Sequence, residues 1–321
     1  MKKIFLWGLA MILFFLEIMP IQAQNSSFRI LTASNVRIRQ KPNASAPEVT
    51  KLALGTLVQE LGRTPKQETI GAVQDYWYQI AIPDGQQGWI FGGFTMVYQE
   101  TQREAIYQEI TQARLKREQL NWFDQIDLVR FLTHASGEVS TPAIAAELKL
   151  ARLRVLRQSL EPLQNPPPEF QAWIQEQQAN IYYAEIQGTW LVLPNVFWDL
   201  YAEYQTLPIA DDIAWEAAQN PVGGECEGYV PCHLSRINQS YGRYLTLYPT
   251  GKYTSTALHT ISEELQNFTQ HKYTDYDRTG YLTLQNEIKR LRSIVEATSI
   301  PEKVGVLEQL EQIARLHLHR E

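Results

Sequence analysis

The chain reads NVRIRQKPNASAPEVTKLALGTLVQELGR over residues 35–63 and YWYQIAIPDGQQGWIFGGFTMVY over residues 76–98, and these two stretches decide the fold of its first part. In both, short apolar runs alternate with turn residues, a pattern typical of β-strands joined by tight turns. The segment PDGQQG (residues 83–88) separates two alternating runs and predicts a hairpin. About seventy residues with five or six short strands is the size of a small β-barrel.

Three motifs in these stretches follow the order found in one bacterial family. NVRIRQKP (35–42) resembles the N-V-R-x-x-P segment that opens the family, and LALGTLVQEL (52–61) places a glycine before an apolar strand. WYQI (77–80) followed by GWI (88–90) is similar to the family's last hairpin. The chain here resembles the bacterial SH3 family, which implies an SH3-like barrel over residues 27–98. It departs from the family in one extra residue before Pro42 and in a longer polar loop, GRTPKQETIGAVQD (62–75).

The resemblance implies binding rather than chemistry, because such modules usually belong to cell-envelope proteins and hold cell-wall peptide. The candidate ligand-binding side chains are aromatic or cationic: Arg37, Arg39, Tyr76, Trp77, Tyr78, Trp89 and Phe91. Aromatic rings offer a large flat contact area, and arginine can form two parallel hydrogen bonds with a peptide carboxylate. The alternative is that Trp77, Trp89 and Ile80 simply fill the barrel, since a small barrel needs bulky interior residues.

The first residues, MKKIFLWGLAMILFFLEIMPIQAQ, predict a cleaved export signal over residues 1–23. Lys2 and Lys3 precede an apolar stretch, Pro20 breaks it, and Ala23 supplies the small residue before the cleavage site. Glu17 leaves the apolar run short for a bilayer span of ~20 residues, so we expect no stable membrane span after cleavage. The protein is therefore expected to be exported, to the periplasm or the extracellular space.

Length and charge set two further limits. A chain of 321 residues is too long for one small core, so at least two domains are expected. Because the formal net charge is −6, the chain would gain little binding free energy from neutralising phosphates. This argues against nucleic acid as a partner. The oligomeric state is not indicated.

After Tyr98 the apolar residues recur at helical spacing, which predicts a larger all-α domain of irregular helical hairpins over residues 99–321. Thr141 and Pro142 stand in the positions that favour a helix start. NPPPEFQAWIQEQQANIYYAEIQ (165–187) is expected to be another helix opened by prolines. YLTLYPTGKYTSTAL (244–258) resembles the helix-turn-helix joint of tetratricopeptide-like repeats. The whole is therefore an α+β multidomain chain.

The two cysteines of the chain lie in GGECEGYVPC, at Cys226 and Cys232. In an exported protein two cysteines close in sequence are expected to form a disulfide. A zinc ion held by both cysteines with His233 and either Glu225 or Glu227 is an alternative, as are a redox pair and a lone nucleophile. The spacing fits neither structural zinc sites nor C-x-x-C redox motifs, which favours the disulfide.

The region from 188 to 232 is the richest in aromatic and acidic residues and is a candidate pocket. Its candidate lining combines aromatic rings with carboxylates: Trp198, Tyr201, Asp212, Trp215, Glu216, Glu225, Glu227 and Tyr229. The alternative is that the rings form a core stripe, with Asp211 and Asp212 stabilising the first turn of a helix.

No catalytic motif is recognisable. The chain contains no G-x-S-x-G, S-x-x-K or H-E-x-x-H, its histidines are scattered, and neither a metal site nor a cofactor is indicated. A glutamate-based cell-wall hydrolase leaves little sequence trace, and Glu216 or Glu225 would be its acid. The sequence thus favours an exported, non-catalytic envelope protein that binds peptidoglycan peptide or a protein partner, with the helical domain as an interaction scaffold. The alternative is a hydrolase or an accessory subunit of one.

Overall fold

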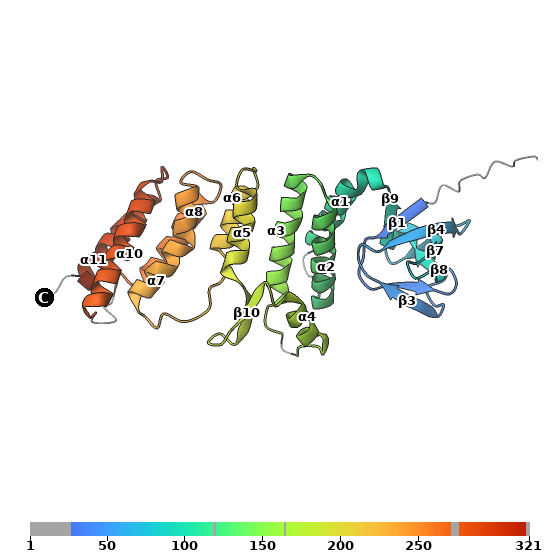
Figure 1. Ribbon diagram of the computed structural model, residues 1–321, viewed down its shortest axis with the longest axis horizontal. Coiled ribbons are helices and arrows are strands. Elements are labelled where there is room, and N and C mark those ends of the chain that lie inside the picture. Colours follow the sequence, from blue (N-terminus) through green and yellow to red (C-terminus); the bar gives the residue numbers. More distant parts are fainter. Residues whose placement is uncertain (1–26, 118–119, 164, 271–275, 319–321) are drawn as a thin grey trace, which may run out of the picture.

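The computed structural model describes residues 27–117, 120–163, 165–270 and 276–318. A β-sheet region comes first and a helical region follows, so the predicted α+β architecture is confirmed (Figure 1). The expected export signal lies outside the described residues.

The β-region is built around a seven-stranded antiparallel sheet with the strand order β3-β2-β8-β7-β4-β1-β9. Its strands are β1 (Ser27–Leu31), β2 (Val36–Arg39), β3 (Glu48–Leu52), β4 (Leu57–Arg63), β7 (Trp77–Ala81), β8 (Gln87–Phe91) and β9 (Thr95–Tyr98). The sheet curls around buried side chains that alternate along the strands, such as Ile38, Ile80 and Ile90. The predicted hairpin at PDGQQG joins β7 to β8, with Trp77 opposite Phe91 and Ala81 opposite Gln87.

The long loop that departs from the SH3 pattern is itself ordered. It forms a small hairpin of β5 (Glu68–Ile70) and β6 (Val73–Asp75), which packs against the 3-10 turn η1 (Gly92–Phe94) that follows β8. Gly71 takes a positive φ of 61° at the tip of this hairpin, a conformation that glycine adopts without a steric penalty.

The helical region forms a row that starts beside the sheet and ends at the far end of the molecule (Figure 1). The helices are α1 (Arg103–Leu115), α2 (Trp122–Glu138), α3 (Pro142–Ser159), α4 (Glu169–Gln177), α5 (Pro194–Tyr204), α6 (Ala210–Ala218), α7 (Val230–Gln239), α8 (Tyr241–Leu247), α9 (Thr254–Gln266), α10 (Arg278–Glu296) and α11 (Lys303–Leu318). Helix α3 begins at Pro142 with Thr141 before it, as the sequence predicts. Neighbours pack as pairs, α2 on α3 and α5 on α6, while α10 packs against both α7 and α11.

One predicted helix is largely wrong. The stretch 165–187 is helical only in α4, and the chain then forms a hairpin of β10 (Ile181–Ala184) and β11 (Thr189–Val192). Ile181, Tyr182 and Tyr183 favour a pleated strand over a helix, and Gly188 turns the chain back with a positive φ of 62°. The helical domain is therefore not purely α-helical.

The two regions share one apolar core. Ile30 and Leu54 of the sheet region belong to the core cluster formed by the helices, and the Leu54 amide donates a hydrogen bond of 2.9 Å to Asp127 of α2. Gly55 approaches Phe131 so closely that an added Cβ would lie 2.4 Å from the ring. On α1, the buried Arg114 pairs with Asp124 and reaches across the joint to the Ser34 hydroxyl. Its guanidinium lies 3.1 Å from the Asp124 carboxylate and donates at 3.2 Å to Ser34. The sheet region is therefore packed directly onto α1 and α2 rather than connected to the helices by a linker alone.

Candidate functional site

A cavity of about 370 Å³ opens on the sheet region between β2, the β5–β6 hairpin and η1. Four of the seven predicted ligand-binding residues line it: Arg37, Arg39, Trp77 and Phe91. We call this cavity the barrel pocket.

The aromatic wall of the barrel pocket is rigid. Trp77 and Phe91 face each other across β7 and β8 with ring centroids 5.7 Å apart, and Phe94 follows Phe91 at 5.8 Å. Trp77 is 3 % exposed and its indole N–H donates a hydrogen bond of 2.8 Å to Glu68 of the β5–β6 hairpin. Phe94 is 39 % exposed, so the wall runs from a fixed, buried ring to an accessible one. An exposed ring supported by buried rings is suited to contact with an apolar or planar ligand group.

Two cationic side chains of β2 also line the barrel pocket. Arg37 is mostly exposed and forms a 3.3 Å ion pair with Glu48, an exposed contact that contributes little stability. Arg39 donates one hydrogen bond of 2.9 Å to the Ala46 carbonyl oxygen and forms no ion pair within the described residues. Both side chains retain N–H donors, and arginine can form two parallel hydrogen bonds with a carboxylate.

The other three predicted residues lie outside the barrel pocket. Tyr78 follows Trp77 on the same strand, so it points to the opposite face and packs in the core beneath Arg29, whose guanidinium carbon lies 3.7 Å from the ring centroid. Tyr76 stacks under Arg63 at 4.4 Å. Trp89 is half-buried between the cross-strand neighbours Gln79 and Arg39.

Sequence reasoning missed the other seven residues that line the barrel pocket, of which Ile70 and Phe94 are discussed here because they come from the β5–β6 hairpin and η1. Ile70 lies in the loop that departs from the SH3 pattern, and this loop forms one wall. Phe94 stands directly after the Gly92–Gly93 pair, where η1 replaces the strand alternation. A large ring after two glycines was the signal available for Phe94, whereas the position of Ile70 depends on how the β5–β6 hairpin folds back.

The predicted acidic and aromatic pocket in the helical region is split into separate clusters. Trp215 of α6 stacks on Tyr253 with centroids 5.0 Å apart and planes 8° from parallel. Asp212 accepts hydrogen bonds from Lys252 and Tyr253. Burial opposes ionisation of Asp212, but these two hydrogen bonds outweigh it, so its pKa lies below the usual value.

Asp211 contacts the same segment between α8 and α9 as Asp212 does. It accepts hydrogen bonds from the Tyr244 hydroxyl at 2.6 Å and from the Lys252 amide at 2.8 Å. Both acids are in the first turn of α6, as predicted, and together they fasten α6 to the turn between α8 and α9. In this part of the candidate pocket the two carboxylates therefore stabilise the packing of α6 against the α8–α9 turn.

Glu216, a candidate hydrolytic acid, lies in the interface between α6 and α3. Its two carboxylate oxygens accept hydrogen bonds from Arg154 at 2.7 Å and from Arg157 at 2.6 Å. These contacts hold α6 on α3 and leave no free oxygen aimed at a cavity. Glu225 and Glu227 are exposed, and Tyr229 lies against Tyr276 with ring centroids 5.8 Å apart, so the structure does not bring these three to the Trp215 cluster.

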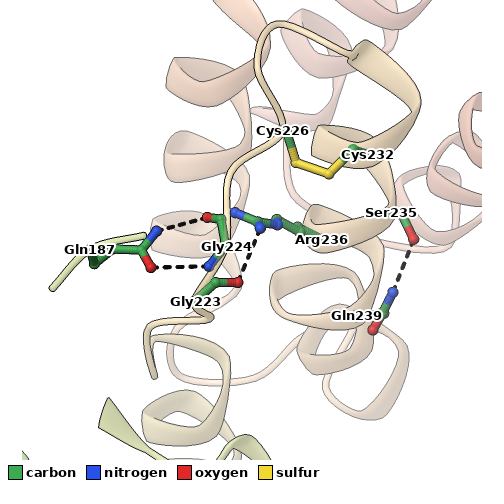
Figure 2. Close-up of a disulfide and its surroundings, with 8 residues drawn as sticks. All are labelled: Gln187, Gly223, Gly224, Cys226, Cys232, Ser235, Arg236 and Gln239. Atoms are coloured by element: carbon green, nitrogen blue, oxygen red, sulfur yellow. Dashed lines mark hydrogen bonds between the residues drawn. A yellow bond between two sulfur atoms is a disulfide. The ribbon is translucent and has the colours of Figure 1, made fainter. Parts of the chain in front are cut away.

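The predicted disulfide between Cys226 and Cys232 is present, with Cα atoms 5.5 Å apart (Figure 2). Both sulfur atoms are used in this bond, so they are not zinc ligands. Gln187 of the β10–β11 turn donates to the Gly224 carbonyl and accepts from the Gly224 amide. The loop is thus held at both ends, by the disulfide and by Gln187. Within the described part of the chain, no cluster of three or more potential metal-binding side chains occurs.

Comparison with known proteins agrees with the predicted resemblance of the sheet region. Residues 34–95 match the family model described as Bacterial SH3 domain. Searches of curated proteins and of solved structures found no match to the chain. Among the described helices, none is both long and apolar enough to cross a membrane. The match covers the whole barrel pocket apart from Ala33, and it ends before α1 begins, so the first part of this chain is similar to bacterial SH3 domains.

Proposed function

We propose that the protein is an exported, non-catalytic component of the cell envelope that binds cell-wall peptide through the barrel pocket. The peptide would place a carboxylate between Arg37 and Arg39 and an apolar side chain against Phe94. The helical region would serve as a scaffold for a protein partner.

The observation that carries this proposal is the mixed lining of the barrel pocket, which combines aromatic rings with two arginines. A short peptide with a free carboxylate has the complementary groups, since its backbone and side chains pack on rings and its carboxylate accepts from guanidinium groups. Bacterial SH3 domains, to which residues 34–95 are similar, suggest cell-wall or peptide binding. The cavity of about 370 Å³ suits a few residues of extended peptide rather than a folded partner.

Two observations support a non-catalytic role for the helical region. Glu216 is engaged by two arginines, and Glu225 is exposed on the loop that leads to the disulfide. A row of packed helices offers an extended surface, which is the form that repeat-like scaffolds present to partners.

The proposal is tested by co-sedimentation of the full chain with purified peptidoglycan and by titration with a short synthetic cell-wall peptide. Point variants are preferable to an isolated fragment, because cutting after Tyr98 would expose Ile30 and Leu54. Phe94→Ala and Arg39→Gln should each weaken peptide binding by about tenfold, the size expected for one central contact. The same peptide with an amidated C-terminus should lose the contribution of Arg39.

Matched controls exist in the same region. Phe28→Ala removes a ring of similar exposure, 41 % against 39 % for Phe94, that does not line the barrel pocket. Arg63→Gln removes a guanidinium that stacks on Tyr76 instead. Equal binding by the Phe94 and Phe28 variants would sink the proposal for this pocket. Release of soluble fragments from the peptidoglycan by the purified protein would contradict the non-catalytic role and indicate a hydrolase.

A further inference from the structure

A second cavity, of about 680 Å³, lies in the helical region between α5–α6 and α7–α8–α10. Three arginines from three different helices line it: Arg236 of α7, Arg243 of α8 and Arg290 of α10. Trp198 of α5 also lines it. We call this cavity the arginine cavity. It shares no residue with the barrel pocket, and Trp198 is the one member of the predicted aromatic and acidic pocket that it contains.

The three arginines are not neutralised by the protein. Within the described residues none of them forms an ion pair; Arg236 is half-buried, whereas Arg243 and Arg290 are exposed. The single carboxylate in the wall, Asp199, accepts a hydrogen bond of 3.0 Å from the neighbouring Asn195. The lining therefore carries a net positive charge in a chain whose total charge is −6.

Two of the guanidinium groups are held in place. Arg243 lies over the Trp198 ring at 3.8 Å, a stacking contact that fixes its plane and leaves its N–H groups free to donate. Arg236 donates a hydrogen bond of 3.2 Å to the Gly223 carbonyl, on the loop held by Gln187 and the disulfide (Figure 2). Such preorganisation lowers the entropic cost of binding.

One buried acceptor lies in the same wall. Asn220 is 4 % exposed, and its side-chain N–H group donates to the Val192 carbonyl at 3.0 Å. Its side-chain oxygen, Oδ1, has no hydrogen-bond partner in the structure. Buried acceptors are normally satisfied, so this oxygen, which is itself shielded from solvent, is an unsatisfied acceptor in the wall.

We propose that the arginine cavity binds a ligand that carries a phosphate group or closely spaced carboxylates. Unpaired guanidinium groups that line one cavity repel one another, and an oxyanion relieves that repulsion while accepting their hydrogen bonds. The cavity volume and the Trp198 ring leave room for an attached apolar or sugar-like portion of the ligand.

The test is calorimetric titration of the full chain with two probes, pyrophosphate and citrate, at constant ionic strength adjusted with sodium chloride. Arg290→Gln should weaken binding of the preferred probe by about tenfold, and the double variant with Arg243→Gln by about a hundredfold. Lys289→Gln is the matched control, because it removes a neighbouring exposed charge of α10 that does not line the cavity. Arg290 is exposed and its side chain has no hydrogen bond or ion pair with another described residue, so its variant stays informative even if loss of the Arg243 stacking unfolds the protein.

The outcomes separate the sources of the anion and decide the proposal. Tighter binding of pyrophosphate indicates a phosphorylated ligand, and tighter binding of citrate indicates a polycarboxylate. Equal weakening of binding by Arg290→Gln and Lys289→Gln would show a general charge effect, and binding unchanged by Arg290→Gln would place the anion elsewhere; either result would overturn the proposal. Absence of binding by both probes would overturn it as well. None of these results depends on peptide binding by the barrel pocket.

Discussion

The barrel pocket and the arginine cavity are both cationic clefts with an aromatic side, but they are assembled in different ways. The barrel pocket draws its lining from residues 33–94, on neighbouring strands and the turns between them. The arginine cavity draws its lining from residues 194–290, on helices that meet only in the folded chain. The pattern of residues close in sequence therefore indicates the barrel pocket. The arginine cavity forms only when distant helices pack together.

The two sites also differ in what holds them. The wall of the barrel pocket depends on the sheet and the β5–β6 hairpin. Ser34, which lines this pocket, accepts a hydrogen bond from Arg114 of the helical region. The arginine cavity depends on a loop fixed by a disulfide. A change at the joint between the regions should therefore affect the barrel pocket, and a change at the loop should affect the arginine cavity.

The largest effect is expected from Gly55→Ala at the joint. Gly55 has a φ of 79°, and an added Cβ would lie 2.4 Å from Phe131 of α2, so strain and overlap act together. We expect a loss of about 3 kcal/mol in the free energy of unfolding, measured by urea denaturation.

Gly85→Ala supplies the control for that change. Gly85 has a similar φ of 87° but has open space around it, so only the backbone strain remains. Its loss should be about 1 kcal/mol. Equal losses for the two variants would mean that the sheet region is not packed on α2 as described, and that the two regions fold independently.

A smaller effect is expected from replacing both Cys226 and Cys232 by serine. Opening so short a ring costs about 2 kcal/mol on the chain-entropy model. Because Arg236 bonds the same loop, the variant should also bind the preferred anion probe less tightly, while peptide binding by the barrel pocket stays unchanged. Thermal denaturation and the two titrations measure this. Weakened peptide binding with unchanged anion binding would reverse the comparison between the sites.

The sheet region was largely predictable because the residues that determine its strands and turns lie close together in the sequence. Alternating apolar residues and the PDGQQG turn predict the β7–β8 hairpin, and its register places Trp77 against Phe91. Tyr78 was placed in the candidate site although strand alternation alone sends it to the opposite face from Trp77. Ile70 escaped prediction because the loop that carries it departs from the family pattern.

The helical region was predictable in its elements but not in its sites. Thr141, Asp211 and Asp212 take the helix-start positions that propensity favours. Their partners do not follow from propensity, since Asp211 bonds Tyr244 and Lys252, which are more than thirty residues away along the chain (|i−j| of 33 and 41). The convergence of Arg236, Arg243 and Arg290 on one cavity likewise depends on how α7, α8 and α10 pack.

The smallest effect is expected at the α1–α3 contact, next to the joint, from Glu104→Gln. The Glu104 carboxylate accepts hydrogen bonds from the hydroxyl and amide of Thr141 and from the amide and hydroxyl of Ser140, which lower its pKa from about 4.5 to about 2. A lowered pKa means that this contribution to stability is complete above about pH 4.5 and is lost as the pH falls towards 2. The variant should therefore melt a few degrees below the wild type at pH 7, and the gap should close as the medium is acidified.

Glu109→Gln serves as the control for the pH series, because Glu109 lies on the same helix, is exposed, and makes no ion pair or side-chain hydrogen bond with any other described residue. Its melting temperature should follow that of the wild type at every pH. If the gap between Glu104→Gln and the wild type stayed constant from pH 7 to pH 3, the charge of Glu104 would not be what fastens α1 to the start of α3. The position of α1 against the start of α3 would then depend on apolar packing, such as that of Ile106 and Ile110, rather than on this carboxylate.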